Sequence, residues 1–327
     1  MKRVKLVKKS PRKQVGTIAI LIGLLAVVIL LIDILKIGND EGRWIFLELN
    51  NIRNILNQVA INAVIAFGMT LVILVNGIDL SVGSIVALSG VVLGIVFIDL
   101  KVPLLLSYLI VLIIGAITGL ANGLLVTKIK LPPFIVTLGS YQIYRGFAFL
   151  SVNGQAKFTA DESFKIVGNH FLFSAIPISI LVMLFFFLLF YFFMAKTSYG
   201  RKFYLVGQNE VAAMYSGVNI DITRIIAYTS IGVASAMGGI MLASRLGSGS
   251  PNVGVGYELD AIAAVVVGGT SFAGGIGTIQ GTLVGVLILG IINNSLNLLG
   301  VSPFSQQVAR GLIILFAVVL DSTKKSR

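Results

Sequence analysis

Two stretches with one shared pattern decide the fold: Gly77-Ile78-Asp79-Leu80-Ser81-Val82-Gly83-Ser84 and Gly256-Tyr257-Glu258-Leu259-Asp260-Ala261-Ile262-Ala263. In each half an asparagine, a Pro-Phe pair and an Arg-Gly pair follow in the same order, although the spacings differ. A duplicated bundle with acidic and amide groups at related positions is typical of a solute pathway between two related halves. Chance similarity between glycine-rich apolar helices is the alternative explanation.

The composition is that of a polytopic membrane protein. Of the 327 residues, 57% are hydrophobic and 12% are charged, and the mean hydropathy is +0.99. A soluble domain of this length would carry far more charge, and apolar runs recur along the whole chain. The sequence has no cysteine and a single histidine, His170. It therefore offers no Cys-ligated or multi-histidine metal site, and we expect no metal, no cofactor and no catalytic residue.

Positive charge is concentrated at the N-terminus rather than spread over a nucleic-acid-binding surface. The formal net charge is +12, and residues 1–14 hold many of the basic side chains and no acid. Such a basic arm before an apolar run is typical of a cytoplasmic terminus under the positive-inside rule. We therefore expect no nucleic-acid partner.

The apolar runs predict an all-α fold with about ten transmembrane helices in a membrane domain that covers residues 15–323. The expected segments are 15–36, 57–76, 82–98, 103–126, 134–150, 174–195, 224–243, 259–275, 279–299 and 305–321. Those at 82–98, 134–150 and 259–275 are shorter than the roughly 20 residues of a straight span, so we expect them to be tilted, broken or re-entrant. Ten crossings, with most Lys and Arg on one side, predict that both termini are cytoplasmic. The first repeat, about 57–150, and the second, about 224–321, are then inverted relative to each other.

The cytoplasmic loop 196–223 contains a short helix with a signal at each end. Asn209 is a good N-cap, Glu210 suits the first turn, and Gly217 is a good stop after the last turn. Apolar side chains between these signals, among them Met214 and Tyr215, need something to cover them. A partner subunit is the natural candidate, and an interfacial helix on the bilayer is the alternative.

The chain has no phosphate-binding loop of its own. Its nearest glycine-rich run, Gly268 to Gly275, lacks the lysine that such a loop places on the phosphates. We interpret this run as a device for close packing or kinking of helices. If ATP drives the protein, another chain hydrolyses it, and this chain is not an enzyme.

Several blocks of the sequence resemble permeases of sugar-importing ABC transporters. Ala66 to Leu74 leads into the Gly77–Ser84 block, and the further blocks are Gly207–Asn219, Gly256–Gly275 and Asn293–Val301. Together they look like the ribose-type branch, which also includes permeases for xylose, galactose, inositol, nucleosides and a furanosyl signal. The resemblance runs from about Leu47 to Asp321 and leaves out the N-terminal arm.

The resemblance implies a multi-pass permease of the bacterial inner membrane that forms a homodimer. It also implies a cytoplasmic ATP-binding subunit, as two chains or one of double length, and an extracytoplasmic sugar-binding protein. A monosaccharide, with ribose as first choice, would be the substrate. Another sugar, a nucleoside or a furanosyl signal remains an alternative, as does an ion-coupled secondary transporter. The residues that would couple to the ATPase are Asn209, Glu210, Ala212, Ala213, Met214, Tyr215 and Gly217.

Four charged residues fall in or beside the expected helices, namely Asp79, Arg145, Asp260 and Arg310. A charge in the bilayer is costly and must find partners or water, so these side chains line a pathway or form structural or gating pairs. If they form structural pairs between the halves, the candidate pairs are Asp79 with Arg310 or Asp260 with Arg145. Neutral side chains suit a sugar better, and the candidates for the substrate pathway are Asn62, Asn76, Asn122, Tyr141, Gln142, Asn293 and Asn294. The alternative for the amides is hydrogen bonding between helices.

Overall fold

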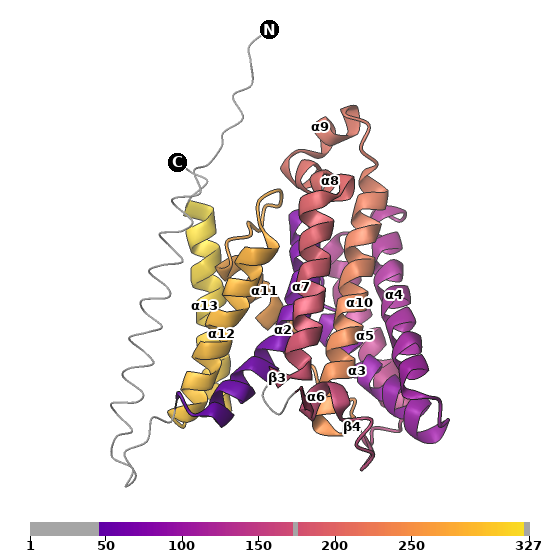
Figure 1. Ribbon diagram of the computed structural model, residues 1–327. Helices are drawn as coiled ribbons and strands as arrows, with labels where there is room; N and C mark the ends of the chain where they lie inside the picture. Colours follow the sequence, from indigo (N-terminus) through magenta and orange to yellow (C-terminus); the bar gives the residue numbers. More distant parts are fainter. Residues whose placement is uncertain (1–45, 173–175, 324–327) are drawn as a thin grey trace.

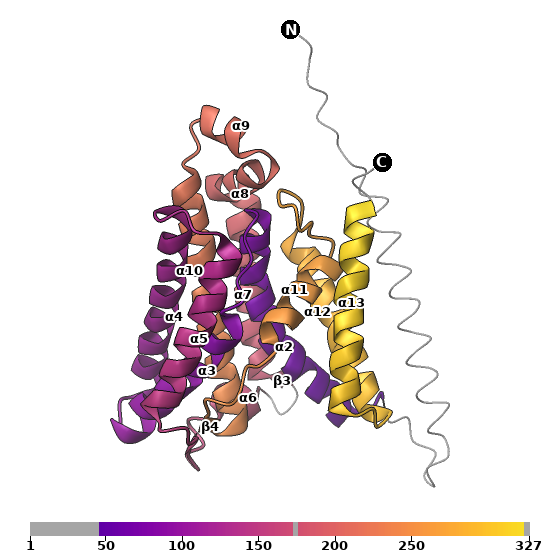
Figure 2. The same cartoon turned by 180° about the vertical axis from the view of Figure 1, so that it is seen from behind.

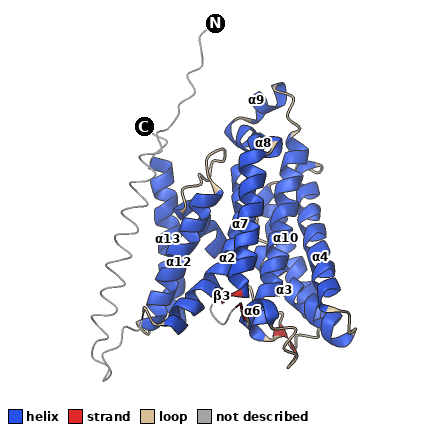
Figure 3. Cartoon of the chain, in the orientation of Figure 1, coloured by secondary structure: helices blue, strands red, loops and turns tan. Residues whose placement is uncertain are grey.

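The computed structural model describes residues 46–172 and 176–323, and helices make up most of this chain (Figure 3). They are α2 (Leu49–Leu74), α3 (Val82–Gly94) with a π-helical turn (Ile95–Asp99), α4 (Leu104–Thr127), α5 (Pro133–Ser151), α6 (Ile166–Asn169), α7 (Ile178–Lys196), α8 (Ser198–Gln208), α9 (Glu210–Tyr215), α10 (Ile220–Leu246), α11 (Tyr257–Val267), α12 (Ile279–Leu298) and α13 (Pro303–Thr323). The basic arm and the expected segment 15–36 lie outside the described residues.

Short strands add two small ribbons to the helical fold. Strand β1 (Lys157–Phe158) pairs antiparallel with β4 (Ser248–Gly249), and β2 (Phe171–Leu172) pairs with β3 (Ile176–Pro177). Each strand has only two residues, so the ribbons fasten loops and do not form a layer of the fold.

Six of the helices in the described chain are long and apolar enough to cross a membrane. They are α2, α3 with its π-helical turn, α4, α7, α10 and α12. Helix α5 has 19 residues and α13 has 21, but neither meets that standard of length and composition. The protein is thus a multi-pass helical membrane protein.

One expected segment ends earlier than its apolar pattern suggested. Helix α11 stops at Val267, whereas the sequence predicted a helix over 259–275. Residues 268–278 instead form a loop, in which Gly269, Gly274 and Gly275 have positive φ angles. Glycine adopts this conformation without steric cost, and it is incompatible with a continuing α-helix. The segment is therefore broken after Val267, which is one of the three forms that its short apolar run predicted.

The helices pack as two groups, and each group includes a helix from the other half of the chain. In the first group α3, α4 and α5 pack together, and α10 from the second half packs on α3 and α4. In the second group α11, α12 and α13 pack together with α2 from the first half. Figures 1 and 2 show these groups side by side, with α8 and α9 at one end of the bundle and β4 at the other. We call these ends the α9 end and the β4 end.

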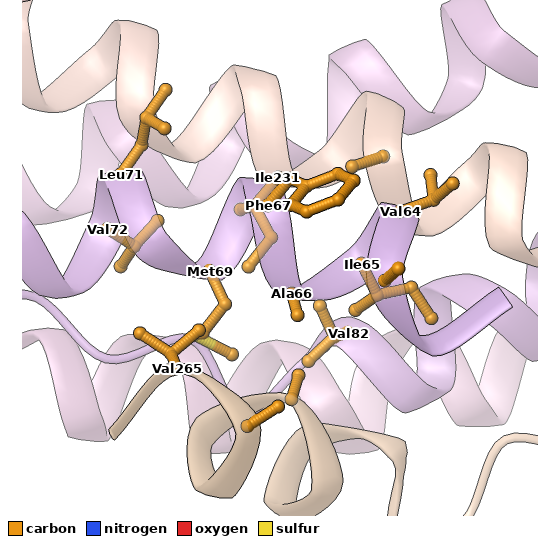
Figure 4. Close-up of a cluster of buried hydrophobic side chains, with 14 of the residues drawn as sticks. Val64, Ile65, Ala66, Phe67, Met69, Leu71, Val72, Val82, Ile231 and Val265 are labelled. Carbon is orange, nitrogen blue, oxygen red and sulfur yellow. The ribbon is translucent and has the colours of Figure 1, made fainter. Parts of the chain in front are cut away.

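The core lies along α2, the helix that touches both groups. Its residues Val64, Phe67 and Met69 are fully buried and pack among side chains that include Ile231 of α10 and Val265 of α11 (Figure 4). Burial on every face is what a helix needs when it lies in the interior of a bundle rather than against lipid.

Small residues bring α4 and α10 into close contact. Gly115, Gly119 and Gly123 recur every four residues on α4 and face α10. A Cβ on Gly119 would lie 2.1 Å from the backbone oxygen of Tyr228, so no larger residue fits there. Close backbone approach at small residues is a general means of associating helices in membranes.

Candidate functional site

The two related motifs lie where the N-terminal ends of α3 and of the short helix α11 meet. Residues 75–81 lead from the end of α2 into α3, and residues 250–256 lead from β4 into α11, which begins part-way along the bundle (Figure 2). A Cβ on Gly83 would lie 2.1 Å from the carbonyl oxygen of Gly254, and a Cβ on Gly254 would lie 2.3 Å from that of Gly83. We call this contact and the residues around it the junction. The backbones of the two halves touch there.

A buried hydrogen-bond network holds the start of α3. The N–H and the hydroxyl of Ser81 both donate to Asp79 Oδ1, at 2.8 and 2.6 Å. Asn122 of α4 donates to the Ser81 hydroxyl at 2.9 Å, and its own Oδ1 accepts from Ser140 of α5 at 2.6 Å. Asp79, Ser81 and Asn122 have no solvent exposure. The network therefore ties the first motif to α4 and α5.

Arg145 of α5 reaches across to the second half, although not to the partner that the sequence suggested. Its Nη1 donates to the carbonyl oxygens of Pro251 at 2.8 Å and Val253 at 2.5 Å, and its guanidinium lies over the Tyr141 ring. The expected pair with Asp260 is wrong. The segment before α11 supplies Arg145 with backbone carbonyls, and Asp260 has another cation, Arg310, within reach.

Asp260 pairs instead with Arg310 of α13, at 3.4 Å, so the expected Asp79–Arg310 pair is also wrong. Both partners belong to the second group of helices, in which α11 packs on α13. Ala263, Leu289 and Asn293 join this ion pair around a small cavity. The side chain of Asn293 is thus beside a charged pair, at 5% exposure.

The remaining amide and aromatic candidates are scattered. Asn294 exchanges two hydrogen bonds with Asn51 of α2, at 2.7 and 3.0 Å. Asn62 is half-buried on α2, whereas Tyr141 is half-buried and Gln142 exposed on α5. Asn76 is exposed at the α9 end and donates to the Gly207 carbonyl at 3.2 Å. The structure therefore gathers Asn122 with Asp79, and Asn293 with Asp260 and Arg310, but does not bring all the candidates to one place.

Helix α9 has the caps that its sequence predicted. The Asn209 side chain accepts from the Ala212 N–H at 3.0 Å, and Glu210 pairs with Arg224 of α10. At the other end the Gly217 N–H donates to Met214 and the Val218 N–H donates to Ala213, each at 3.0 Å. This pair of bonds, with Gly217 at a φ of 75°, is a Schellman motif. The predicted start and stop are confirmed.

The surface of α9 is apolar and open. Tyr215 is 83% exposed, Val211 59% and Met214 56%, and Ala212 is exposed as well. Ala213 differs, because it is 1% exposed and packs into the loop itself. The exposed surface of α9 thus consists of the other apolar side chains.

Helix α8 connects α9 to the loop that follows α11. The Tyr204 hydroxyl donates to the Gly277 carbonyl at 2.9 Å, and the Gln208 amide donates to the Gly275 carbonyl at 3.2 Å. The Gly275 N–H in turn donates to the carbonyl of Leu74, the last residue of α2, at 2.9 Å. The end of α2, helix α8 and loop 268–278 therefore form one hydrogen-bonded unit at the α9 end.

Comparison with known proteins identifies the family. The model of the branched-chain amino acid transport system / permease component family matches residues 51–318, which is most of the chain. The chain belongs to this permease family.

Curated relatives match the permease over nearly its whole length. The ribose import permease protein RbsC of Bacillus subtilis (strain 168) is 44% identical over 86% of this chain and 87% of its own. RbsC of Haemophilus influenzae is 40% identical over 91% of this chain and 92% of its own. The galactose/methyl galactoside import permease protein MglC of Escherichia coli (strain K12) is 38% identical over 86% of this chain and 89% of its own. No solved structure gives a significant match.

Sequence reasoning about the permease did not single out Glu258. This side chain is half-buried at the junction, and its Oε1 accepts from the Gly256 N–H at 3.2 Å. The signal was present, because aligning the two motifs residue by residue places Glu258 opposite Asp79.

Proposed function

We propose that this permease is the membrane subunit of an ATP-driven importer for ribose. The relatives named as ribose import permeases support this proposal, since they share 40–44% identity over most of both chains. The relative named for galactose is 38% identical, which favours ribose among the monosaccharides. The family and the long apolar helices support a location in the bacterial inner membrane.

The observation that carries the coupling part of this proposal is helix α9. It is fixed by caps at both ends and by the Glu210–Arg224 pair, yet it presents Val211, Met214 and Tyr215 to solvent. A rigid helix with an apolar surface outside the bundle suits a groove in a partner protein. We infer that this partner is the cytoplasmic ATP-binding subunit. Asn209, Glu210 and Gly217 would position the helix, and Ala212, Met214 and Tyr215 would contact the ATP-binding subunit.

We infer that the two halves are inverted repeats. Helix α2 ends at the α9 end and is followed by a non-helical segment and helix α3. Helix α10 ends at the β4 end and is followed by a non-helical segment and the short helix α11. This arrangement supports the expected inversion of the repeats, and the sugar-binding protein would dock at the β4 end.

A second copy of the permease would complete the pathway. Helix α5 exposes Ile135, Leu138 and Gln142, and a Cβ on Gly139 or Gly146 would meet no atom of the described residues within 4 Å. Exposed glycines on an apolar helix let a second helix approach closely. We infer a homodimer that forms across this face, with Tyr141, Gln142, Asn62 and Asn293 along the substrate pathway.

Reconstitution tests the proposed function directly. The permease is placed in proteoliposomes with its ATPase and binding protein, and uptake of labelled ribose and galactose is followed. We expect ribose uptake that needs ATP, is unaffected by an ionophore and exceeds galactose uptake. Uptake without ATP that collapses with the ion gradient would instead identify an ion-coupled secondary transporter.

A further inference from the structure

The junction holds buried polar atoms that have no partner among the residues that the structure describes. Arg145 is 9% exposed, and within residues 46–172 and 176–323 its Nε and Nη2 have no hydrogen-bond acceptor, although its Nη1 donates to the carbonyls before α11. The Oε2 of Glu258 is also buried and lacks a donor in the same part of the chain. Spare donors and a spare acceptor are costly to bury in a membrane protein unless something satisfies them at some stage of its work. These atoms come from opposite halves of the chain.

Three elements converge on these atoms. Glu258 lies in the first turn of α11, and a Cβ on Gly83 of α3 would lie 2.3 Å from its Oε2. The carbonyls that bind Arg145 belong to the segment that leads into α11. The N-terminal ends of α3 and α11, with 13 and 11 residues, thus meet beside an arginine from α5. Paired ends of interrupted helices between inverted repeats are where transporters hold small solutes.

We propose that Glu258 and Arg145 bind hydroxyl groups of the transported monosaccharide at the junction. This inference rests on the proposed function and gives it a site. A sugar hydroxyl both donates and accepts, so one ring can satisfy the carboxylate and the guanidinium together. An anionic solute would be repelled by Glu258, and a cation would be repelled by Arg145. A neutral polyol therefore fits the two side chains best.

The contact between Gly83 and Gly254 keeps the junction closed in this structure. Their backbones are too near for a sugar ring to pass, so the ring enters only when α3 and α11 separate. The exposed side chains of Val255 and Leu259 flank Glu258 on the α11 side. A probe at either position reports whether the opened junction is occupied.

The absence of native cysteines allows a direct test. Leu259→Cys places a single thiol next to Glu258, and Asp161→Cys places a control thiol in an exposed loop. Each variant is reconstituted with ATPase, binding protein and ATP, and is labelled with a membrane-impermeant maleimide. We expect ribose to slow labelling of Leu259→Cys by about ten-fold. Adding Glu258→Gln or Arg145→Lys should abolish this effect while the labelling rate without sugar stays the same.

The control separates a bound sugar from a docked binding protein. Docking would slow labelling of Asp161→Cys equally with and without Glu258→Gln, whereas occupation of the junction depends on Glu258.

If the wild-type importer takes up ribose but ribose leaves Leu259→Cys labelling unchanged, the junction is not the binding site. The junction is also not the binding site if ribose still slows labelling of Leu259→Cys in the presence of Glu258→Gln and in the presence of Arg145→Lys. If the wild-type importer takes up no ribose, the proposed function itself is wrong. If Glu258→Gln fails to reach the membrane, the proposal is still tested by whether ribose slows labelling of Leu259→Cys and whether Arg145→Lys abolishes that effect.

Discussion

Helices α3 and α11 begin with related motifs but are held in different ways. The acid before α3, Asp79, has no exposure and belongs to a network that reaches α4 and α5. The acids of α11, Glu258 and Asp260, are half-buried, and Asp260 has one partner at 3.4 Å. We interpret α3 as the fixed wall of the junction and α11 as its movable side. On this interpretation the two motifs have different mechanical roles.

The segments that follow these two helices support the same distinction. Helix α3 continues directly into a π-helical turn, whereas α11 ends in a loop that contains three glycines with positive φ. That loop is held by α8, which leads to α9. A displacement of α9 by a partner would therefore reach α11 through this loop, and it would reach the segment before α3 through the bond of Asn76 to Gly207 of α8.

Gly83→Ala should have the largest effect, because the junction allows no side chain there. The new Cβ would lie 2.1 Å from the backbone oxygen of Gly254. Overpacking costs typically about 1–3 kcal/mol, and a backbone oxygen cannot rotate away, so we expect the upper end of that range. Thermal unfolding in detergent measures the loss. Gly90→Ala in the same helix is the control, since its Cβ would meet its nearest atom at 3.5 Å. Equal unfolding midpoints for the two variants would show that the close approach of Gly83 to Gly254 does not exclude a side chain from the junction.

Tyr215→Glu tests whether the ATP-binding subunit acts on the permease through α9. The side chain is 83% exposed, so the permease should fold normally. Losing the burial of one such side chain in a partner groove is worth about 1.5–3 kcal/mol, or roughly 10- to 100-fold in ATPase recovery on co-purification. Tyr215→Phe keeps the apolar area and should keep the partner. Ala213→Glu would be a poor test, because Ala213 is buried and its replacement would damage the loop. Unchanged ATPase recovery with Tyr215→Glu would favour an interfacial helix on the bilayer.

Asn122→Ala and Asn293→Ala compare the fixed side with the movable side. Asn122 bonds to Ser81 and Ser140, so its removal leaves buried groups unsatisfied and should cost about 1–3 kcal/mol. Asn293 lies beside a small cavity with no hydrogen bond in the described chain, so its replacement should change stability much less. Unfolding midpoints of the two variants give the comparison. An equal loss in both would show that α11 is held as firmly as α3.

Tyr204→Phe should have the smallest effect, on the link between α8 and the loop after α11. Removing the hydroxyl deletes its bond to Gly277, worth about 1 kcal/mol, or roughly a five-fold change in ribose uptake. ATPase recovery should not change, because α9 is intact. Tyr199→Phe is the matched control on the same helix, where the described chain gives the hydroxyl no hydrogen bond. Uptake that is equal in both variants would exclude this bond from coupling.

Local sequence signals predicted local structure well. Asn209, Glu210 and Gly217 marked both ends of α9, because caps depend on residues within one or two turns. The apolar runs likewise located α2, α3, α4, α5, α7, α10, α11, α12 and α13, whereas they gave no signal for the shorter α6 and α8. The glycine run from Gly268 was less clear, because glycine serves both close helix packing and helix termination. Its first residue does pack closely on Gly281 of α12, but the run also ends α11.

Contacts between distant segments could not be predicted in the same way. The sequence indicated that Arg145 and Asp260 need partners, but charge alone does not say which helices are neighbours. Arg145 found backbone carbonyls, which no pattern of side chains reveals. Asp260 found Arg310 because α13 packs on α11. The candidate pathway residues depend on the same missing information, since a buried amide can serve a network or a solute equally well.

The exchange of helices between the two groups has a consequence for biogenesis. Helix α2 is synthesised early, yet it packs on α11 and α12, which are among the last to be made. Until then its Thr70, which bonds to Thr282 of α12, and its Asn51, which bonds to Asn294, lack their partners. An unfinished chain therefore carries polar groups on α2 that keep only their local bonds, to the carbonyls of Ala66 and Phe46, until α12 has been made. We expect fragments that stop before α12 to be recognised and degraded during membrane insertion, and neither half to persist when expressed without the other.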